Sequence, residues 1–327
     1  MQSTMKVVVK ERVQCGDKVV ALTLNRPDGT ALPEWDAGAH VDVQVLDKLG
    51  APAMRQYSLC GAQEPARDWR IAVLDECDGR GGSSWLHRHA QVGRELTVSA
   101  PRNHFALHSD ASPAILVAGG IGVTPILAMA HALKARGTAF SVHYFARNQS
   151  AVAFTAEWQE GPLAVHSHIT LDDMANGSQS DFSARLSCEV TPDTHLYVCG
   201  PAGFMDAVVA ELMTRGLSPQ RVHRELFSGS QLPSDGAAAK AFEIELRSDG
   251  RIIHVASDRS AVQALAEAGI DVVVSCEQGL CGSCLTPVLA GLPDHRDQFM
   301  LPEEHERNDC FTPCCSRALT PRLVLDL

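Results

Sequence analysis

The sequence predicts a multidomain protein with three parts: a small antiparallel β-barrel, an α/β domain with a parallel sheet, and an α+β domain that carries a cysteine loop. Residues 6–102 contain short apolar segments separated by turns, which is typical of a small closed barrel. Residues 112–214 alternate apolar strands, glycine-rich turns and helical segments, as parallel sheets do. Four spaced cysteines near the C-terminus mark the third part.

Length and charge limit the classes of partner. The chain has 327 residues, 45% hydrophobic and 20% charged, with a net charge of −11. Such a charge argues against nucleic acid or an anionic membrane as partner. Residues 241–327 carry 14 acidic and 7 basic residues, so this part holds −7 of the total. The acidic surface is either simply solvated or a docking face for a basic patch on an electron acceptor.

We expect a cytoplasmic protein. The N-terminus lacks the charged and apolar regions of a signal peptide, and no apolar run reaches membrane-spanning length. The cysteines outside the C-terminal group show no disulfide framework, which suits a reducing compartment.

The expected barrel strands are separated by turns such as residues 27–29 and 36–38. They cover residues 7–9, 18–24, 40–45, 55–59 and 69–74. We place this domain at residues 1–105.

The second domain, residues 106–229, begins with a buried strand and continues in βα units. Strands are expected at residues 115–118, 140–145 and 196–199, with helices at residues 125–135 and 205–214. Ligands of such sheets bind at the carboxyl ends of the strands.

Residues 228–240 are rich in Ser, Gly, Pro and Ala, and we place an interdomain linker at residues 230–240. The third domain, residues 241–327, opens with a hairpin of residues 242–246 and 252–255. A helix over residues 260–268 follows, and residues 272–274 lead into the cysteine loop.

The cysteine spacing is C-x4-C-x2-C, followed by one more cysteine after 29 intervening residues. The four positions are Cys276, Cys281, Cys284 and Cys314. This is the plant-type ferredoxin spacing for a 2Fe–2S cluster. Gly279 and Gly282 allow the loop to adopt positive φ close to the sulfurs. A structural zinc site is disfavoured, because zinc ribbons pair two Cys-x2-Cys knuckles and only one is present.

Two barrel segments predict a phosphate site. Arg55 and Tyr57 lie two residues apart on one strand and therefore share a face, with Ser58 next to them. The string Gly-Arg-Gly-Gly-Ser-Ser at residues 79–84 opens a helical segment, where successive N–H groups form an anion nest. Each signal is weak alone, whereas the pair is much stronger.

Two loops of the second domain predict a dinucleotide site. The string Gly-Gly-Ile-Gly-Val-Thr-Pro at residues 119–125 follows a buried strand and precedes a helix, so N–H groups and the helix dipole face a pyrophosphate. Cys-Gly-Pro at residues 199–201 ends another strand of the same sheet. We expect both loops to border one cleft.

Together these motifs resemble the phthalate dioxygenase reductase family, which includes the vanillate O-demethylase reductase components. That family joins a flavin barrel, an NAD domain and a C-terminal plant ferredoxin-like, β-grasp domain. The resemblance covers essentially the whole chain. It rests on residues 55–58, 79–83, 119–125 and 199–201, the cysteine loop and the ending Cys-Cys-Ser-Arg-Ala at residues 314–318.

The resemblance assigns site residues. Those implied for the flavin are Arg55, Tyr57, Ser58, Gly81, Gly82, Ser83 and Ser84, with Arg55 and the loop backbone on the phosphate. Those implied for the nucleotide are Gly120, Gly122, Thr124, Pro125, Cys199, Gly200 and Pro201. Ser58 would hydrogen-bond near the hydride-accepting nitrogen, Cys199 would lie near the nicotinamide, and Phe227 would lie over the flavin. These last three are the implied catalytic positions.

The Cys-Cys pair leaves two choices for the fourth cluster ligand. We assign Cys314, because the following Ser-Arg-Ala matches the family, and we interpret Cys315 as packing and Cys310 as uninvolved. His166, His168 and the other histidines show no metal spacing, so we expect surface or core roles for them.

The resulting hypothesis is an NADH-dependent reductase that passes electrons from NADH to flavin, to the 2Fe–2S cluster and to a partner Rieske oxygenase. We expect FMN rather than FAD, because the 79–84 loop resembles a terminal-phosphate cradle. The chain contains no Cys-x-His pair, so it is not itself a Rieske protein. A reductase for another acceptor and a redox sensor without catalysis are the alternatives.

Overall fold

The computed structural model describes residues 4–63, 68–172, 185–186, 188–227, 240–274, 276–280, 282–297, 300 and 302–327. Residues up to Phe227 form one compact unit, and the described residues from Lys240 onward belong to a second. Of the predicted linker at residues 230–240, only Lys240 lies within the described residues. The predicted boundary between residues 105 and 106 lies inside the first unit.

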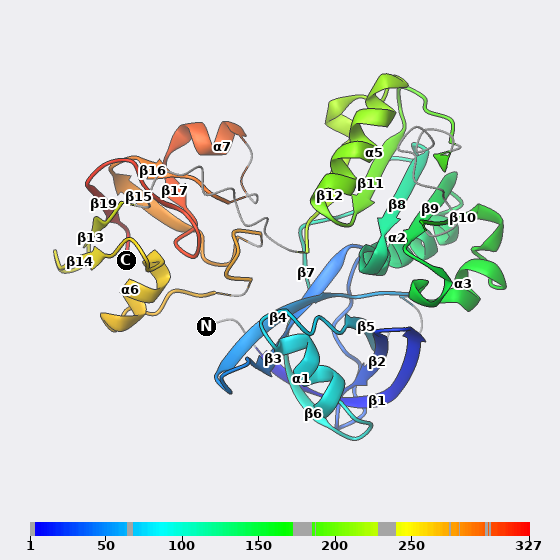
Figure 1. Cartoon of the computed structure of the whole chain (residues 1–327), viewed down its shortest axis with the longest axis horizontal. Helices are drawn as coiled ribbons and strands as arrows, with labels where there is room; N and C mark the ends of the chain where they lie inside the picture. The colour runs from blue at the N-terminus through cyan, green and yellow to red at the C-terminus, as the bar shows by residue number, and fades with distance from the viewer. Residues whose placement is uncertain are drawn as a thin grey trace. The chain divides into compact units, whose positions relative to one another are not determined.

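The first unit begins with an antiparallel barrel (Figure 1). Its strands are β1 (Thr4–Gly16), β2 (Val19–Asn25), β3 (Ala39–Leu46), β4 (Pro52–Ser58), β5 (Trp69–Leu74), β6 (Glu95–Ser99) and β7 (Arg102–Asn103). The strand order is β4-β3-β6-β1-β2-β5, with β7 paired to β3. An antiparallel bridge between Leu59 and Ile71 joins the two ends and closes the barrel. The helix α1 (Gly82–His89) contributes Leu86 to the barrel core.

A parallel sheet follows in the order β10-β9-β8-β11-β12. Its strands are β8 (Ala114–Gly119), β9 (Phe140–Ala146), β10 (Ser167–Leu171), β11 (His195–Cys199) and β12 (Val222–Glu225). All residues of β8 are buried, as expected for a strand covered on both faces. The helices are α2 (Val123–Arg136), α3 (Thr155–Gln159) and α5 (Ala202–Thr214), and short 3-10 turns lie at Gly120–Gly122, Gln149–Ala151, Ala164–His166 and Pro219–Arg221.

The two long helices cover opposite faces of this sheet. Leu116 and Ala118 of β8 share a core with α2, whereas Ile115 and Val117 share a core with α5. The order of strands reverses between β8 and β11, and each of these strands leads into one of the helices. Such a switch point is where open parallel sheets bind ligands, so the fold places the site at the ends of β8 and β11.

The barrel and the sheet share one hydrophobic core. Val19, Ala72 and Phe105 of the barrel part pack in the same cluster as α2 and β9. At its edge, Arg70 of β5 donates to the Glu157 carboxylate of α3 at 2.7 Å. The barrel therefore has a fixed position against the nucleotide domain.

The second unit contains a five-stranded sheet in the order β14-β13-β19-β15-β17. Its strands are β13 (Phe242–Leu246), β14 (Ile252–Val255), β15 (Thr286–Ala290), β17 (Cys310–Phe311) and β19 (Arg322–Leu325); β16 (Pro293–Asp294) pairs with β18 (Arg317–Ala318). The central strands β13 and β19 run parallel, and β14 is antiparallel to β13. The helices are α6 (Ala261–Glu267), which begins with a Ser260–Gln263 capping box, and α7 (Pro302–Arg307).

The predicted fold class is confirmed, with an antiparallel barrel, a parallel-sheet domain and a C-terminal α+β domain. Among the described residues, no helix is both long enough and apolar enough to cross a membrane.

Candidate active site and cluster-binding loop

The strand β4 carries the first three predicted site residues. Arg55 pairs with Val43 of β3 and Tyr57 pairs with Val41, so both side chains leave the same face of the barrel. Tyr57 packs against the barrel core, and burial raises the pKa of its hydroxyl well above the usual value. The ring is therefore a neutral aromatic surface at physiological pH.

The glycine-rich loop lies directly against Arg55. Gly81 is the N-cap of α1 with φ of 95°, a conformation that favours glycine. A Cβ atom at Gly82 would stand 2.7 Å from Cγ of Arg55, so only glycine lets the loop approach this side chain. The structure thus brings Arg55 and residues 81–84 together, as the motif pair predicted. Ser84 is oriented by its hydrogen bond to Asp75 at 2.6 Å.

A cavity of about 440 Å³ opens beside this loop. Gly81 and Ser84 line it together with Asp47, Lys48, Asp75, Cys77 and Arg88. The sequence motifs did not point to Lys48, which lies in the turn after β3, or to Arg88, which lies in the last turn of α1. The carboxylates of Asp47 and Asp75 balance the two basic side chains, so the N–H groups at the start of α1 are the donors that fit a phosphate group.

The two nucleotide loops meet at the ends of β8 and β11. A Cβ atom on Gly122 would lie 2.3 Å from the backbone oxygen of Cys199, so glycine is required for this contact. Gly120 has φ of 56°, and Thr124 ties the first turn of α2 by donating to the Ile121 oxygen at 3.1 Å. Pro125 lies in the same first turn, and Pro201 is the N-cap of α5. The prediction that both loops border one site agrees with this packing.

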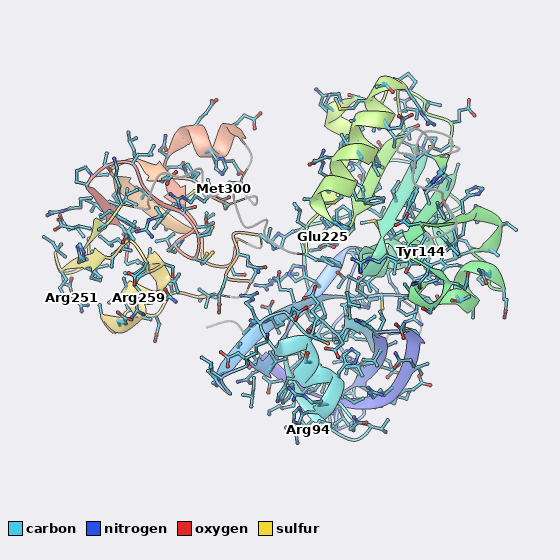
Figure 2. All side chains as sticks on the ribbon, viewed as in Figure 1. Arg94, Tyr144, Glu225, Arg251, Arg259 and Met300 are labelled. Atoms are coloured by element: carbon cyan, nitrogen blue, oxygen red, sulfur yellow. The ribbon has the colours of Figure 1, made fainter. Side chains whose placement is uncertain are left out.

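Ser58 of the barrel faces the nucleotide domain. Its hydroxyl donates to Oε2 of Glu225 at 3.5 Å, and Glu225 is the last residue of β12 (Figure 2). Burial raises the pKa of the Glu225 carboxyl to about 8, although the Ser58 hydrogen bond opposes part of that shift. Cys199 is fully buried nearby, and burial together with Glu225 raises the pKa of its thiol well above the usual value. At neutral pH both Glu225 and Cys199 are therefore uncharged.

Sequence reasoning missed Glu225. Its position at the carboxyl end of a strand in a parallel sheet was the available signal, because such ends carry functional residues. The strand itself was not among those expected. Phe227 lies two residues further on and is 41% exposed, and its predicted role over the flavin stays a prediction.

The cysteine loop has the backbone geometry of a sulfur-binding turn. The N–H groups of Gln278 and Leu280 donate to Sγ of Cys276 at 3.4 and 3.3 Å. Gly279 has φ of 73° and Gly282 has φ of 64°, as the loop was expected to require. Donors aimed at sulfur stabilise thiolate ligands, so the loop fits a 2Fe–2S cluster. Cys281 lies outside the described residues.

The Cys314 and Cys315 side chains differ in their surroundings. The Cys314 thiol lies within hydrogen-bonding distance of Cys284. Sγ of Cys315 lies within hydrogen-bonding distance of Cys314 and contacts the Thr312 hydroxyl at 3.3 Å, and a Cβ atom on Gly279 would stand 2.5 Å from it. Cys314 is the one of the two that also approaches Cys284, and its role as the fourth cluster ligand stays a prediction.

The chain matches two family models. The oxidoreductase NAD-binding domain model matches residues 116–210, and the 2Fe–2S iron–sulfur cluster binding domain model matches residues 244–319. Among solved structures, phthalate dioxygenase reductase superimposes with a TM-score of 0.75 and 32% identity, over 99% of this chain and 98% of that protein.

The chain belongs to the phthalate dioxygenase reductase family. The vanillate O-demethylase oxidoreductase of Acinetobacter baylyi is 43% identical over 99% of both chains. An intact type IV self-sufficient cytochrome P450 monooxygenase contains a similar segment, with a TM-score of 0.83 and 34% identity over 99% of this chain. That segment is 41% of the P450 chain, so the chain spans about two fifths of its length.

The family membership confirms the resemblance inferred from the motifs. This member of the phthalate dioxygenase reductase family is an electron-transfer oxidoreductase with an NAD-binding domain and a 2Fe–2S domain. The flavin follows from the family, and the contact between Arg55 and the 81–84 loop fits its phosphate.

Proposed function

We propose that the chain is the NADH-dependent reductase component of a two-component Rieske non-haem iron oxygenase, of the aromatic ring dioxygenase or O-demethylase type. The observation that carries this proposal is similarity along the full chain to proteins named vanillate O-demethylase oxidoreductase, from Acinetobacter baylyi and from a Pseudomonas strain. The second is 40% identical over 99% of this chain. We expect the cytoplasm as its compartment, because the described cysteines are free thiols.

The residues of the site support the route from NADH to flavin to cluster to oxygenase. When bound, the flavin accepts two electrons as a hydride, and the cluster carries them onward one at a time. Residues 119–125 and 199–201 would hold the nucleotide at the strand ends, and Arg55 with the 81–84 backbone would hold the flavin phosphate. Ser58 and Glu225 stand between these two places, where the nicotinamide and the flavin ring must meet.

The role we assign to Ser58 and Glu225 is to orient the bound groups by hydrogen bonds. The hydroxyl of Ser58 is held toward the nucleotide domain by a protonated carboxyl, so the site presents hydrogen-bonding groups without a net charge. An uncharged carboxyl at this place would not oppose the negative charge that a bound flavin gains when it accepts a hydride. No general base is required for a hydride transfer.

We propose NADH rather than NADPH as the electron donor. A 2′-phosphate requires a basic cluster after the second strand of the nucleotide domain. After β9 the chain reads Arg147-Asn148-Gln149-Ser150, and Asn148 accepts hydrogen bonds from Ala151 and Ser150 within its own turn. A single Arg is available there. Comparable catalytic efficiency with NADPH would contradict this proposal.

A haem protein is the second candidate acceptor. The structural similarity to a segment of a self-sufficient cytochrome P450 monooxygenase favours it. A further relative, 36% identical over 91% of this chain, is named heme-dependent oxidative N-demethylase beta subunit. Both acceptors use the same internal route, and they differ in the protein that takes the electron from the cluster domain.

The decisive experiment is stopped-flow spectroscopy with NADH, the flavin- and cluster-loaded reductase and one acceptor at a time. A purified Rieske O-demethylase oxygenase and a purified cytochrome P450 haem domain are the two acceptors. Catalytically competent reduction of the Rieske centre, and slower reduction of the haem, is the expected result. Preferred reduction of the haem would favour the second candidate, and an absence of NADH oxidation with either would favour the redox sensor.

A further inference from the structure

Three side chains of the second unit converge beside the cysteine loop. His295 and Asp297 follow β16, and His305 lies on α7. One ligand atom from each of the three lies within 4.8 Å of the others. Oδ2 of Asp297 is 3.3 Å from Nε2 of His305, and Oδ1 is 3.9 Å from Nδ1 of His295. The sequence predicted surface or core roles for these histidines, and the structure brings two of them to one carboxylate.

Asp297 is a buried carboxylate without a strong cation beside it. Its side chain is fully buried, with 0% exposed. It accepts from the Met300 N–H at 2.8 Å and from the Ser316 hydroxyl at 3.5 Å. Within the described part of the chain, its ion-pair partners are the two imidazoles and no Lys or Arg. Burying a carboxylate is costly unless hydrogen bonds and a positive charge compensate it, so a cation bound here would add to these partners.

His295 adds a second, independent observation. Its side chain is only 10% exposed, and neither ring nitrogen has a hydrogen-bond partner of acceptable geometry. The Asn308 side chain and the His305 backbone both approach the ring, but neither reaches the distance and angle of a hydrogen bond. Buried nitrogens of this kind are rare in folded proteins, because leaving them unpaired costs about 1–3 kcal/mol.

We propose that His295, Asp297 and His305 bind a divalent transition-metal ion of the zinc class, at a site separate from the 2Fe–2S cluster. Two imidazoles and one carboxylate are a usual ligand set for such ions, with the remaining position open to water. The ion would neutralise Asp297 and give His295 a partner. The imidazoles now stack with centroids 4.4 Å apart at 17°, so binding requires them to turn until their nitrogens converge at about 2.0–2.1 Å from the ion.

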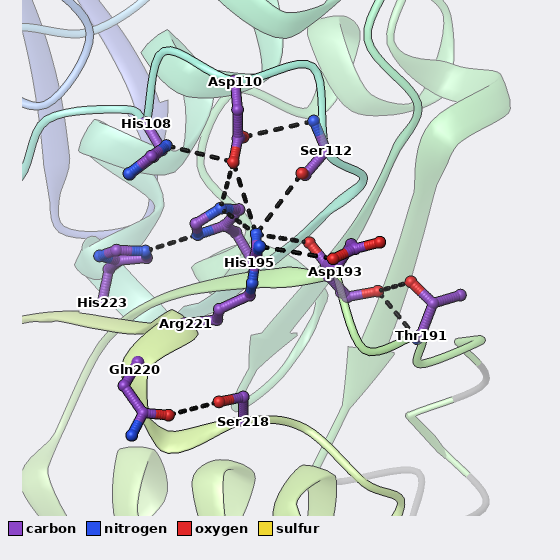
Figure 3. A network of polar contacts seen from close by, with 11 residues as sticks. His108, Asp110, Ser112, Thr191, Asp193, His195, Ser218, Gln220, Arg221 and His223 are labelled. Atoms are coloured by element: carbon purple, nitrogen blue, oxygen red, sulfur yellow. Dashed lines mark hydrogen bonds and ion pairs between the residues drawn. The ribbon is translucent and has the colours of Figure 1, made fainter.

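A second group of two histidines and one aspartate has an arginine beside it. His108, Asp110 and His195 also have ligand atoms within 4.8 Å of one another (Figure 3). His195 is the first residue of β11, and the nucleotide loop at residues 199–201 follows the other end of that strand. There Arg221 stands 2.6 Å from Nε2 of His195 and 3.5 Å from Oδ2 of Asp110. The guanidinium already supplies the positive charge, and this group is therefore the natural control.

The proposed ion would sit behind the cluster loop. A Cβ atom on Gly279 would lie 2.9 Å from Cα of Asp297, which shows how closely the loop packs on this residue. Ser316, which contacts Asp297, is two residues beyond Cys314. An ion at Asp297 would thus fix the segment that supports the loop from both sides.

The test uses the full-length holoenzyme with its cluster assembled, incubated with a small excess of Zn²⁺ and then desalted. Zinc and iron are measured together by mass spectrometry. We expect the wild type to retain a single zinc ion in addition to its iron. His305→Gln should lose the zinc and keep the iron, and His108→Gln should keep both. His295→Gln is the second ligand variant. Loss of zinc with iron retained in both variants would show loss of a ligand, because a folding defect would also reduce the iron content.

X-ray absorption at the zinc edge identifies the ligands of the retained ion. We expect a nitrogen and oxygen shell at about 2.0–2.1 Å with imidazole scattering. A sulfur shell at about 2.3 Å would mean that zinc had entered the cysteines and would overturn the proposal. The proposal would also be overturned if the wild type retained no zinc, or if His305→Gln retained as much zinc as the wild type.

Discussion

Ser58 and Glu225 are joined by a hydrogen bond of 3.5 Å, although 167 residues separate them in the sequence. Ser58 ends a barrel strand, and Glu225 ends the last strand of the parallel sheet. The contact therefore marks the point where the two domains of the first unit meet. Because burial raises the pKa of Glu225 to about 8, this junction contains a protonated carboxyl at neutral pH.

The raised pKa of Glu225 predicts a pH-dependent stability. The ordinary pKa of this group is 4.5. Between that value and about 8 the unfolded chain loses the proton while the folded chain keeps it, so stability falls as the pH rises. Glu225→Gln removes this loss and should raise the free energy of unfolding at pH above 8 by about 1–3 kcal/mol. The side chain is partly exposed, so solvent screening makes this gain smaller than the difference between the two pKa values alone would give.

Thermal unfolding of the variant and the wild type at two pH values measures this effect. The gain should shrink toward pH 4.5. Glu160→Gln changes an exposed carboxylate of the same unit and is the matched control. A stability gain that is the same at low and high pH would show that Glu225 keeps an ordinary pKa.

Cys314 should be the fourth cluster ligand. Cys314→Ser removes the thiol that faces Cys284 and should abolish or sharply destabilise the cluster. Cys315→Ser and Cys310→Ser should retain it, because Cys315 contacts Thr312 and Cys310 contacts Asp309. Iron content and the visible spectrum of each variant give the answer, and loss of the cluster in the Cys315 variant alone would reverse the assignment.

Arg55 should hold the flavin phosphate. Arg55→Ala removes a charge-assisted hydrogen bond and should weaken flavin binding by about 1.5–3 kcal/mol. Lys10→Ala removes a positive charge from the exposed barrel surface, where it pairs with Asp68, and should leave binding unchanged. Fluorescence titration of the apoprotein measures both. Chromatography of the flavin released from the wild type should show FMN, and FAD as the main species would contradict this expectation.

The acidic helix α7 should steer the partner. Glu303 and Glu306 are exposed and Glu304 is half-buried, where it pairs with Arg307 at 3.7 Å. Attraction between surface charges extends over a Debye length, about 8–10 Å at physiological salt. Neutralising all three should slow electron delivery to the oxygenase as added salt does, while the NADH-dependent reduction of flavin within the chain stays nearly constant.

The control for this prediction removes the same charge elsewhere in the second unit, at Asp258, Glu267 and Asp271. Stopped-flow kinetics with the partner at two salt concentrations provides the measurement. A transfer rate that does not respond to salt would leave α7 as a solvated helix, which is the alternative the charge count left open.

Local order was readable from the sequence. Residues 115–118 form a continuous apolar run because both faces of β8 are buried, and the helix expected at residues 125–135 is α2. The spacing of Cys276, Cys281 and Cys284 specified the cluster loop, since a chain must turn within a few residues to place thiols around one cluster. The glycines beside Arg55 and Cys199 signalled the close approaches that the structure contains.

Contacts between distant segments were decided only by the tertiary structure. Glu225 reaches Ser58, and Arg70 reaches Glu157, because the barrel and the sheet share one core. Asp297 and His305 meet because α7 folds back on the segment after β16. Sequence spacing records which residues are near along the chain. The order of strands and the packing of domains determine which distant side chains meet, and therefore where a carboxyl is buried next to a hydroxyl or next to two imidazoles.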